Sequence, residues 1–152
     1  MNTLIDNIKS AFKNTPYPGS EYSDISATRY DDEGVHQYFK NSDQFEHSVE
    51  DLRYHSCALS FFTDAAFRYW LPAFMLAELR DPEEADIIAD TIAFSLYTSG
   101  AHQRISSFSD SELIAVKEFL FECTRRYDDE ISSEPFMKAL SKIQQFETHT
   151  KN

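Results

Sequence analysis

The chain contains few residues that let a polypeptide turn sharply: three glycines and five prolines among 152 residues. An all-β sandwich or barrel needs a turn about every ten residues, and such turns are rich in Gly, Pro, Asn and Asp. The scarcity of glycine therefore argues against an all-β fold. Thirteen Phe, eight Tyr and one Trp supply apolar side chains for a core, which argues against global disorder. We predict an all-α fold, with one compact domain of about six to seven helices over residues 1–152.

Apolar residues recur at helical spacing in several segments, and some of these segments begin with a recognisable cap. The clearest cap precedes Leu113, where Ser109 and Glu112 match a capping box. A second start combines Asp81 as the cap with Pro82 at the first helical position. An irregular loop rich in acidic residues and Tyr is predicted at residues 15–31. The predicted helices lie at about residues 3–14, 32–40, 44–54, 64–80, 82–98, 110–127 and 134–146.

The segment that begins at Phe62 predicts a central, buried helix. Thr63 suits the N-cap, and Asp64 places a negative charge in the first turn, where the helix dipole favours it. The apolar residues that follow lie on nearly all sides of the helix, which is typical of an element at the centre of a core. Pro72 leaves two interpretations open: a kinked helix, or one helix that ends near Tyr69 and a second that starts at Pro72.

Residues 59–79 read LSFFTDAAFRYWLPAFMLAEL. This stretch resembles the signature of an uncharacterised bacterial domain-of-unknown-function family, which has the form LSFLTPEAFRYYLPAYLL. The sequence differs at Asp64, where the signature has proline, and at Trp70, where it has tyrosine. A fainter likeness extends over residues 31–123. The resemblance implies an all-helical fold, and it implies no activity.

The N-terminal segment and the apolar runs predict a cytoplasmic protein. Residues 1–6 contain no basic region followed by a long apolar run, so they do not resemble a signal peptide. The longest apolar run, Tyr69–Ala77, has nine residues, about half of what a membrane-spanning helix needs. Cys57 and Cys123 are the two cysteines, and in such a compartment we expect them to be buried thiols.

Three residues have the spacing of a metal site on a helix. His47, Asp51 and His55 are spaced four apart, so one helix would place them on one face, and histidine and carboxylate are ligands for zinc and iron. The apolar residues of the same segment define the opposite face as the inner one. We therefore expect a solvated surface here and keep the trio as the candidate for a metal site. Cys57 follows His55 by two residues, but nothing in the sequence places a base beside this thiol.

Arg68 lies within the apolar, aromatic segment and has two interpretations. It would anchor a phosphate or carboxylate, or it would pair with Asp64 one turn earlier and lay its stem along a neighbouring aromatic ring. Local pairing is the more common arrangement. The chain has no phosphate-binding loop, no dinucleotide fingerprint and no nucleophile elbow. We predict no catalytic residue, no cofactor and no enzymatic activity.

The acidic residues are concentrated in two segments. Residues 21–51 contain nine acidic and two basic residues, and residues 81–90 contain five acidic residues and no basic one. Together these segments account for the whole formal net charge of −12. Tyrosines are interleaved with the acids of the first segment, a composition that suits recognition of a basic protein. A solubilising surface with no partner is the other interpretation.

This charge distribution argues against nucleic acids and anionic membranes as partners, and it favours a protein-binding function. Small size, acidity and the lack of a catalytic motif favour a bacterial immunity protein that neutralises a cognate basic toxin domain by direct binding. Two alternatives stay open: a small metal- or Cys-dependent hydrolase, and a housekeeping or phage-related interaction protein without a toxin partner. The predicted partner-binding residues are Tyr22, Asp24, Tyr30, Asp31, Asp32, Glu33, Tyr38, Glu83, Glu84 and Asp86.

Overall fold

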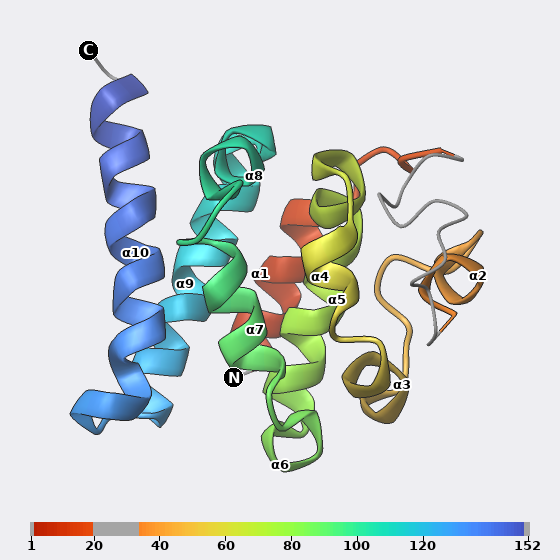
Figure 1. The fold of residues 1–152 in the computed structure, drawn as a ribbon, viewed down its shortest axis with the longest axis horizontal. Helices are drawn as coiled ribbons and strands as arrows, with labels where there is room; N and C mark the ends of the chain where they lie inside the picture. The colour runs from red at the N-terminus through yellow and green to blue at the C-terminus, as the bar shows by residue number, and fades with distance from the viewer. Residues whose placement is uncertain (1, 20–33, 151–152) are drawn as a thin grey trace.

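The computed structural model describes residues 2–19 and 34–150. These residues form ten α-helices and no β-strand, which confirms the all-α prediction (Figure 1). In chain order the helices are α1 (Asn2–Phe12), α2 (Val35–Phe39), α3 (Val49–Tyr54), α4 (Ala58–Phe61), α5 (Asp64–Arg80), α6 (Pro82–Ala85), α7 (Ile88–Ser95), α8 (Ala101–Ser107), α9 (Asp110–Arg126) and α10 (Glu130–Thr150).

The central helix of this arrangement is α5. It packs against α1, α3, α6, α7 and α8, and every residue from Trp70 to Leu79 is buried. Thr63 caps the helix as predicted, because its hydroxyl oxygen accepts a hydrogen bond from the amide of Ala66 at 3.2 Å. Pro72 lies inside one continuous helix of 17 residues, which decides between the two interpretations of this proline.

Helices α9 and α10 form the flank seen on the left of Figure 1. Ser109 and Glu112 make the predicted capping box, with the Ser109 amide 2.7 Å from a carboxylate oxygen of Glu112. The last helix begins at Glu130, four residues before the predicted start, because the Asp129 carboxylate accepts a hydrogen bond from the Ser132 amide at 2.9 Å. Although α10 has 21 residues, none of the described helices combines the length and the apolarity needed to cross a bilayer.

Two further predicted helices differ from the structure at their boundaries. Helix α3 begins at Val49, five residues later than predicted, because Ser48 is its N-cap and accepts a hydrogen bond from the Asp51 amide at 3.1 Å. The helix predicted over residues 82–98 is divided into α6 and α7 at Asp86, whose φ of 54° lies in the left-handed region. The sequence pattern does not reveal α4 and α8, because 4 and 7 residues are too few to show a helical period.

Candidate functional site

The predicted partner-binding residues fall into three groups. Tyr38 lies on α2, and Glu83, Glu84 and Asp86 lie on α6 or directly after it. Helices α2 and α6 belong to different parts of the fold. The remaining group lies outside the described residues: Tyr22, Asp24, Tyr30, Asp31, Asp32 and Glu33.

The Tyr38 side chain is partly buried and makes specific contacts within the protein. Its hydroxyl oxygen is 2.7 Å from Nδ1 of His47, and its ring stacks on the ring of His55 with 4.4 Å between the centroids. Burial and the nearby Asp51 carboxylate raise the pKa of Tyr38 to about 12. Tyr38 therefore packs α2 against the end of α3, and only part of its side chain remains accessible to a partner.

The trio of His47, Asp51 and His55 does not share one solvated helix face, so that expectation is wrong. His47 precedes the helix, because Ser48 is the N-cap of α3. His55 follows the helix and is buried against the Tyr38 ring. Across residues 2–19 and 34–150, no group of three or more His, Cys, Asp or Glu side chains lies close enough together to hold a metal ion.

Helices α3 and α6 pack against each other, and this contact brings the two acidic segments of the sequence together. Arg53 on α3 lies 3.5 Å from a carboxylate oxygen of Glu84 on α6, and both side chains remain partly exposed. The surface around this contact is called the acidic face below, together with the exposed residues of α7, the helix that follows α6. Its carboxylates are Glu50, Asp51, Asp81, Glu83, Glu84, Asp86 and Asp90, and its basic residues are Arg53 and Arg80.

Large hydrophobic side chains are exposed on the helices of the acidic face. Tyr54 at the end of α3 is 61% exposed, and Ile87 and Phe94 of the α7 segment are 51% and 53% exposed. Ile87 and Phe94 are seven residues apart, so they lie on one side of α7, together with the exposed Asp90. Figure 1 shows α6 and α7 beside α5, with α3 next to α6. The acidic face thus combines apolar side chains with an excess of carboxylates.

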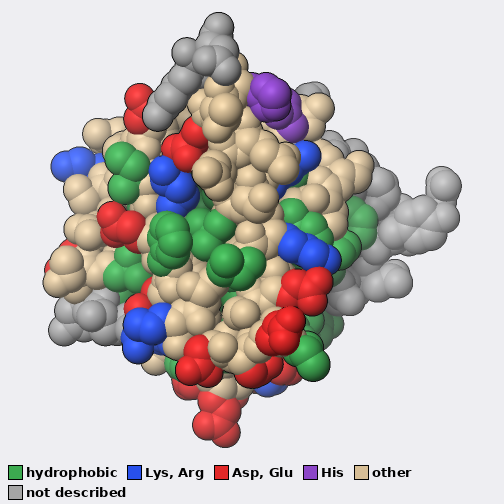
Figure 2. Space-filling view, turned by 90° about the vertical axis from the view of Figure 1, so that its left-hand side faces the viewer, with side chains coloured by type: hydrophobic (Ala, Val, Ile, Leu, Met, Phe, Trp, Pro, Cys, Tyr) green, Lys and Arg blue, Asp and Glu red, His purple; other side chains and the backbone are tan. Residues whose placement is uncertain are grey.

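The flank made by α9 and α10 is a second surface with exposed hydrophobic residues. Phe121, 60% exposed, and Met137 line a groove of about 490 Å³ between the two helices. Lys117 and Glu147 form an ion pair of 2.8 Å at this groove. Figure 2 shows hydrophobic side chains near the centre of this flank, with acidic and basic side chains interspersed around them. This flank lies on α9 and α10 and not on the helices of the acidic face, so variants there serve as controls in binding experiments.

Arg68 pairs with Glu112 of α9, so the predicted pairing with Asp64 is wrong. Nε of Arg68 lies 2.7 Å from Oε1 of the buried Glu112, and the Thr15 hydroxyl also donates to this carboxylate. Burial raises the pKa of Glu112, but the hydrogen bonds that it accepts, first of all the one from Arg68, outweigh burial and hold the pKa below its ordinary value. Arg68 therefore ties α5 to α9, and Asp64 stays at the protein surface.

Glu78 of α5, like Glu112, is a buried carboxyl group, and the sequence pattern marks neither of them. Its side chain is 0% exposed, and Tyr127 donates a hydrogen bond of 2.6 Å to Oε2. Burial raises the pKa of Glu78, and this effect exceeds the lowering by Tyr127, Arg126 and the Ala89 amide. Burial and the bond to Glu78 also raise the pKa of Tyr127.

Replacing Glu78 by glutamine is expected to stabilise the protein more at pH 8 than at pH 5. Because the folded-state pKa of Glu78 lies above its unfolded value, the wild type loses stability as the pH rises from the unfolded value through the folded one. Glutamine does not ionise and can still accept the hydrogen bond from Tyr127. Urea unfolding at both pH values measures the difference between variant and wild type. Glu83→Gln, at an exposed site, is the control, and the same pH dependence in both variants would contradict the prediction.

Cys123 does not have the surroundings of an activated nucleophile. Cys123 on α9 is fully buried, and burial followed by the nearby Glu78 carboxyl raises the pKa of its thiol. A catalytic thiol needs a lowered pKa and access to substrate. Both cysteines are thiols, as predicted. The predicted burial is confirmed for Cys123, whereas Cys57, directly before α4, is only partly buried.

Comparison with known proteins adds a family but no activity. No curated protein and no solved structure matches the chain. The model of a family of unknown function (DUF6714) matches residues 1–146, which include all helices of the acidic face and most of α10. The match agrees with the resemblance to an uncharacterised family. Because the match covers nearly the whole sequence, the chain belongs to this family of unknown function.

Proposed function

We propose that the protein binds a basic protein through its acidic face, and that it is a bacterial immunity protein that neutralises a cognate toxin domain in this way. One observation carries the proposal: Tyr54, Ile87 and Phe94 are exposed on the acidic face, which carries seven carboxylates and two arginines. At protein interfaces, most of the binding energy comes from a few large side chains enclosed by a polar rim. The acidic face offers both parts of such an interface.

The charge of the acidic face supports a basic partner. Arg53 pairs with Glu84, and no other carboxylate of the acidic face forms an ion pair with a described residue. Opposite charge on a partner speeds association and disfavours wrong partners. Toxins that act on nucleic acids or nucleotides are often basic. Fast capture of such a domain, with its active site covered, would neutralise it.

Co-expression tests the proposal directly. The gene for this protein is expressed together with the C-terminal domain of a large toxin encoded by the neighbouring reading frame, and growth and co-purification are scored. We expect rescue of growth and a stable complex. A toxin that kills equally with and without the protein would contradict the immunity function. Co-purification with a non-toxic basic protein would retain the acidic face as an interface and replace the toxin by another kind of partner.

Two changes on the acidic face are expected to weaken the complex in different ways. Tyr54→Ala should raise the Kd by about 30-fold, which corresponds to about 2 kcal/mol for a central anchor residue. The double change Glu50→Lys with Glu83→Lys should slow association at low salt and have less effect at high salt, because salt screens interactions beyond a Debye length of about 10 Å at 0.1 M. Stopped-flow or surface-plasmon measurements give the association rate constant and the Kd.

Matched controls come from the flank made by α9 and α10. Phe121→Ala removes an exposed aromatic ring, and Asp128→Lys with Glu130→Lys reverses two exposed charges away from the acidic face. Both control variants should bind like the wild type. Wild-type kinetics in the acidic-face variants, or equal losses in the control variants, would remove the acidic face as the interface.

A further inference from the structure

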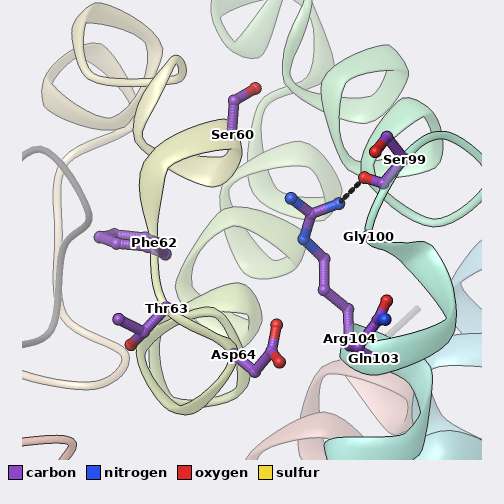
Figure 3. Close-up of a pocket in the computed structure, with 8 residues that line it drawn as sticks. All are labelled: Ser60, Phe62, Thr63, Asp64, Ser99, Gly100, Gln103 and Arg104. Carbon is purple, nitrogen blue, oxygen red and sulfur yellow. Dashed lines mark hydrogen bonds between the residues drawn. The ribbon is translucent and has the colours of Figure 1, made fainter.

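A polar pocket of about 500 Å³ lies between the segment that leads into α5 and the start of α8 (Figure 3). Its volume falls within the range of about 300–1,000 Å³ that is common for small-molecule sites. Arg104 of α8 and Asp64 of α5 provide opposite charges in this pocket, and Ser60, Ser99 and Gln103 add hydrogen-bonding groups. Because polar side chains dominate the lining, a polar ligand fits it better than an apolar one.

The Arg104 guanidinium is held in place on one side. Its Nη1 donates hydrogen bonds to the carbonyl oxygens of Ser95 at 2.9 Å and Ser99 at 3.1 Å, and the group lies 5.5 Å from the centre of the Phe67 ring. Gly100 lies directly beside this group, and its φ of 87° is in the left-handed region that favours glycine. Figure 3 shows the remaining edge of the guanidinium turned toward the pocket. That edge is available for the two parallel hydrogen bonds that arginine makes to a carboxylate.

Asp64 supplies a negative charge to the same pocket. In the described part of the chain it takes part in no ion pair, since Arg68 is directed to Glu112 instead. Asp64 is exposed, and Figure 3 shows it across the pocket from Arg104. The positive charge of Arg104 and the negative charge of Asp64 give the pocket no net charge but a dipole. A doubly charged phosphate would be attracted by Arg104 and repelled by Asp64, whereas a ligand with both charges would match both side chains.

We propose that this pocket binds a ligand with the zwitterionic backbone of an α-amino acid. The ligand carboxylate accepts hydrogen bonds from the open edge of Arg104, and the ligand ammonium group donates to Asp64. The Gln103 amide and the Ser60 and Ser99 hydroxyls are placed to bind a polar side chain of the ligand. This inference does not depend on the proposed function, because none of these residues belongs to the acidic face.

A ligand screen with the full-length protein tests the pocket. The common L-α-amino acids are added singly at millimolar concentration, thermal shift identifies those that bind, and calorimetry measures the Kd. We expect at least one amino acid to raise the Tm. Its α-amide, which lacks the carboxylate, and its N-acetyl derivative, which lacks the ammonium group, should each bind at least about tenfold more weakly. Inorganic phosphate should not compete.

Substitutions link the binding to the two charged side chains. Asp64→Asn and Arg104→Lys should each weaken binding by at least about tenfold, since lysine does not offer two parallel N–H donors. Asp110→Asn is the matched control, because Asp110 also begins a 17-residue helix directly after a hydroxyl cap. The proposal is overturned if no amino acid binds, if the amide and acetyl derivatives bind as well as the parent compound, if phosphate competes, or if Asp64→Asn and Asp110→Asn bind equally.

Discussion

Replacing Phe67 by alanine is expected to lower the free energy of unfolding by about 3–5 kcal/mol. The Phe67 side chain is 0% exposed on the central helix α5, and its ring lies 6.2 Å from that of Phe108. The substitution removes apolar contacts and leaves a cavity that close-packed neighbours fill only in part. Because a domain of this kind is stabilised by only about 5–15 kcal/mol, the loss is a large share of the total. Urea unfolding followed by circular dichroism measures it.

Phe121→Ala is the matched control for this experiment. Phe121 also lies within a 17-residue helix, but its side chain is 60% exposed on α9. Its removal should change the free energy of unfolding by no more than about 0.5 kcal/mol. A soluble Phe67→Ala protein with an unchanged Tm would contradict the central position of the aromatic segment and would make that segment a surface patch.

Replacing Arg68 by methionine is expected to cost about 3 kcal/mol of stability at pH 7. Methionine keeps the apolar stem but leaves the buried Glu112 carboxylate without its cationic partner, and a buried charge that loses its partner is strongly destabilising. The Thr15 hydroxyl and the Ser109 amide still donate to Glu112, so the expected loss lies at the lower end of the range for such pairs. Chemical unfolding of variant and wild type at pH 7 measures the difference.

The loss of unfolding free energy in Arg68→Met should become smaller as the pH falls. In the wild type the folded-state pKa of Glu112 is depressed, so the stability linked to it is present above the unfolded value, near 4.3, and is lost as the pH falls through the folded value. In the variant, the loss of the Arg68 hydrogen bond removes one of the contacts that lower this pKa, so Glu112 is expected to be protonated at a higher pH than in the wild type. Unfolding curves from pH 7 down to about pH 4.5 follow this change.

Arg125→Met provides the comparison for the ion-pair experiment. Arg125 pairs with Glu122 on the surface of α9, where its side chain is largely exposed. Exposed ion pairs contribute only about 0–1 kcal/mol, so this variant should be almost as stable as the wild type at every pH. Equal losses in the two variants, or a loss in Arg68→Met that does not depend on pH, would show that Glu112 is not held as a buried anion.

The cap signals were predictable because each depends on residues a few positions apart. Thr63 caps α5, and Ser109 with Glu112 caps α9, as the local sequence indicates. Local signals also misled at some boundaries: apolar spacing suggested a helix from residue 44, but Ser48 is the N-cap and the helix begins at Val49. The spacing of His47, Asp51 and His55 places them on one face only if a single helix contains all three. Because α3 spans Val49–Tyr54, it contains only Asp51, and the geometric argument for a metal site fails.

The acidic face shows the limit of prediction from sequence more clearly. The sequence shows that residues 81–90 are rich in carboxylates. It does not show that α6 packs against α3, because this contact joins segments about thirty residues apart. The exposure of Tyr54, Ile87 and Phe94 is equally hidden, since an apolar residue in an amphipathic helix is ordinarily assigned to the core. These side chains are surface residues because no other described helix covers that side of α3 and α7.

The sequence by itself determined the helical class, the main caps and the central buried helix, because these follow from spacing and chemistry within a few turns of chain. Only the tertiary structure decided which partner each buried charge has. Arg68 stands four residues from Asp64 but bonds to Glu112, 44 positions away, since helix packing encloses Glu112 and leaves Asp64 at the surface. An enclosed carboxylate loses its hydration and gains more from a cation than an exposed one does. The same packing leaves Asp64 to face Arg104 across the pocket.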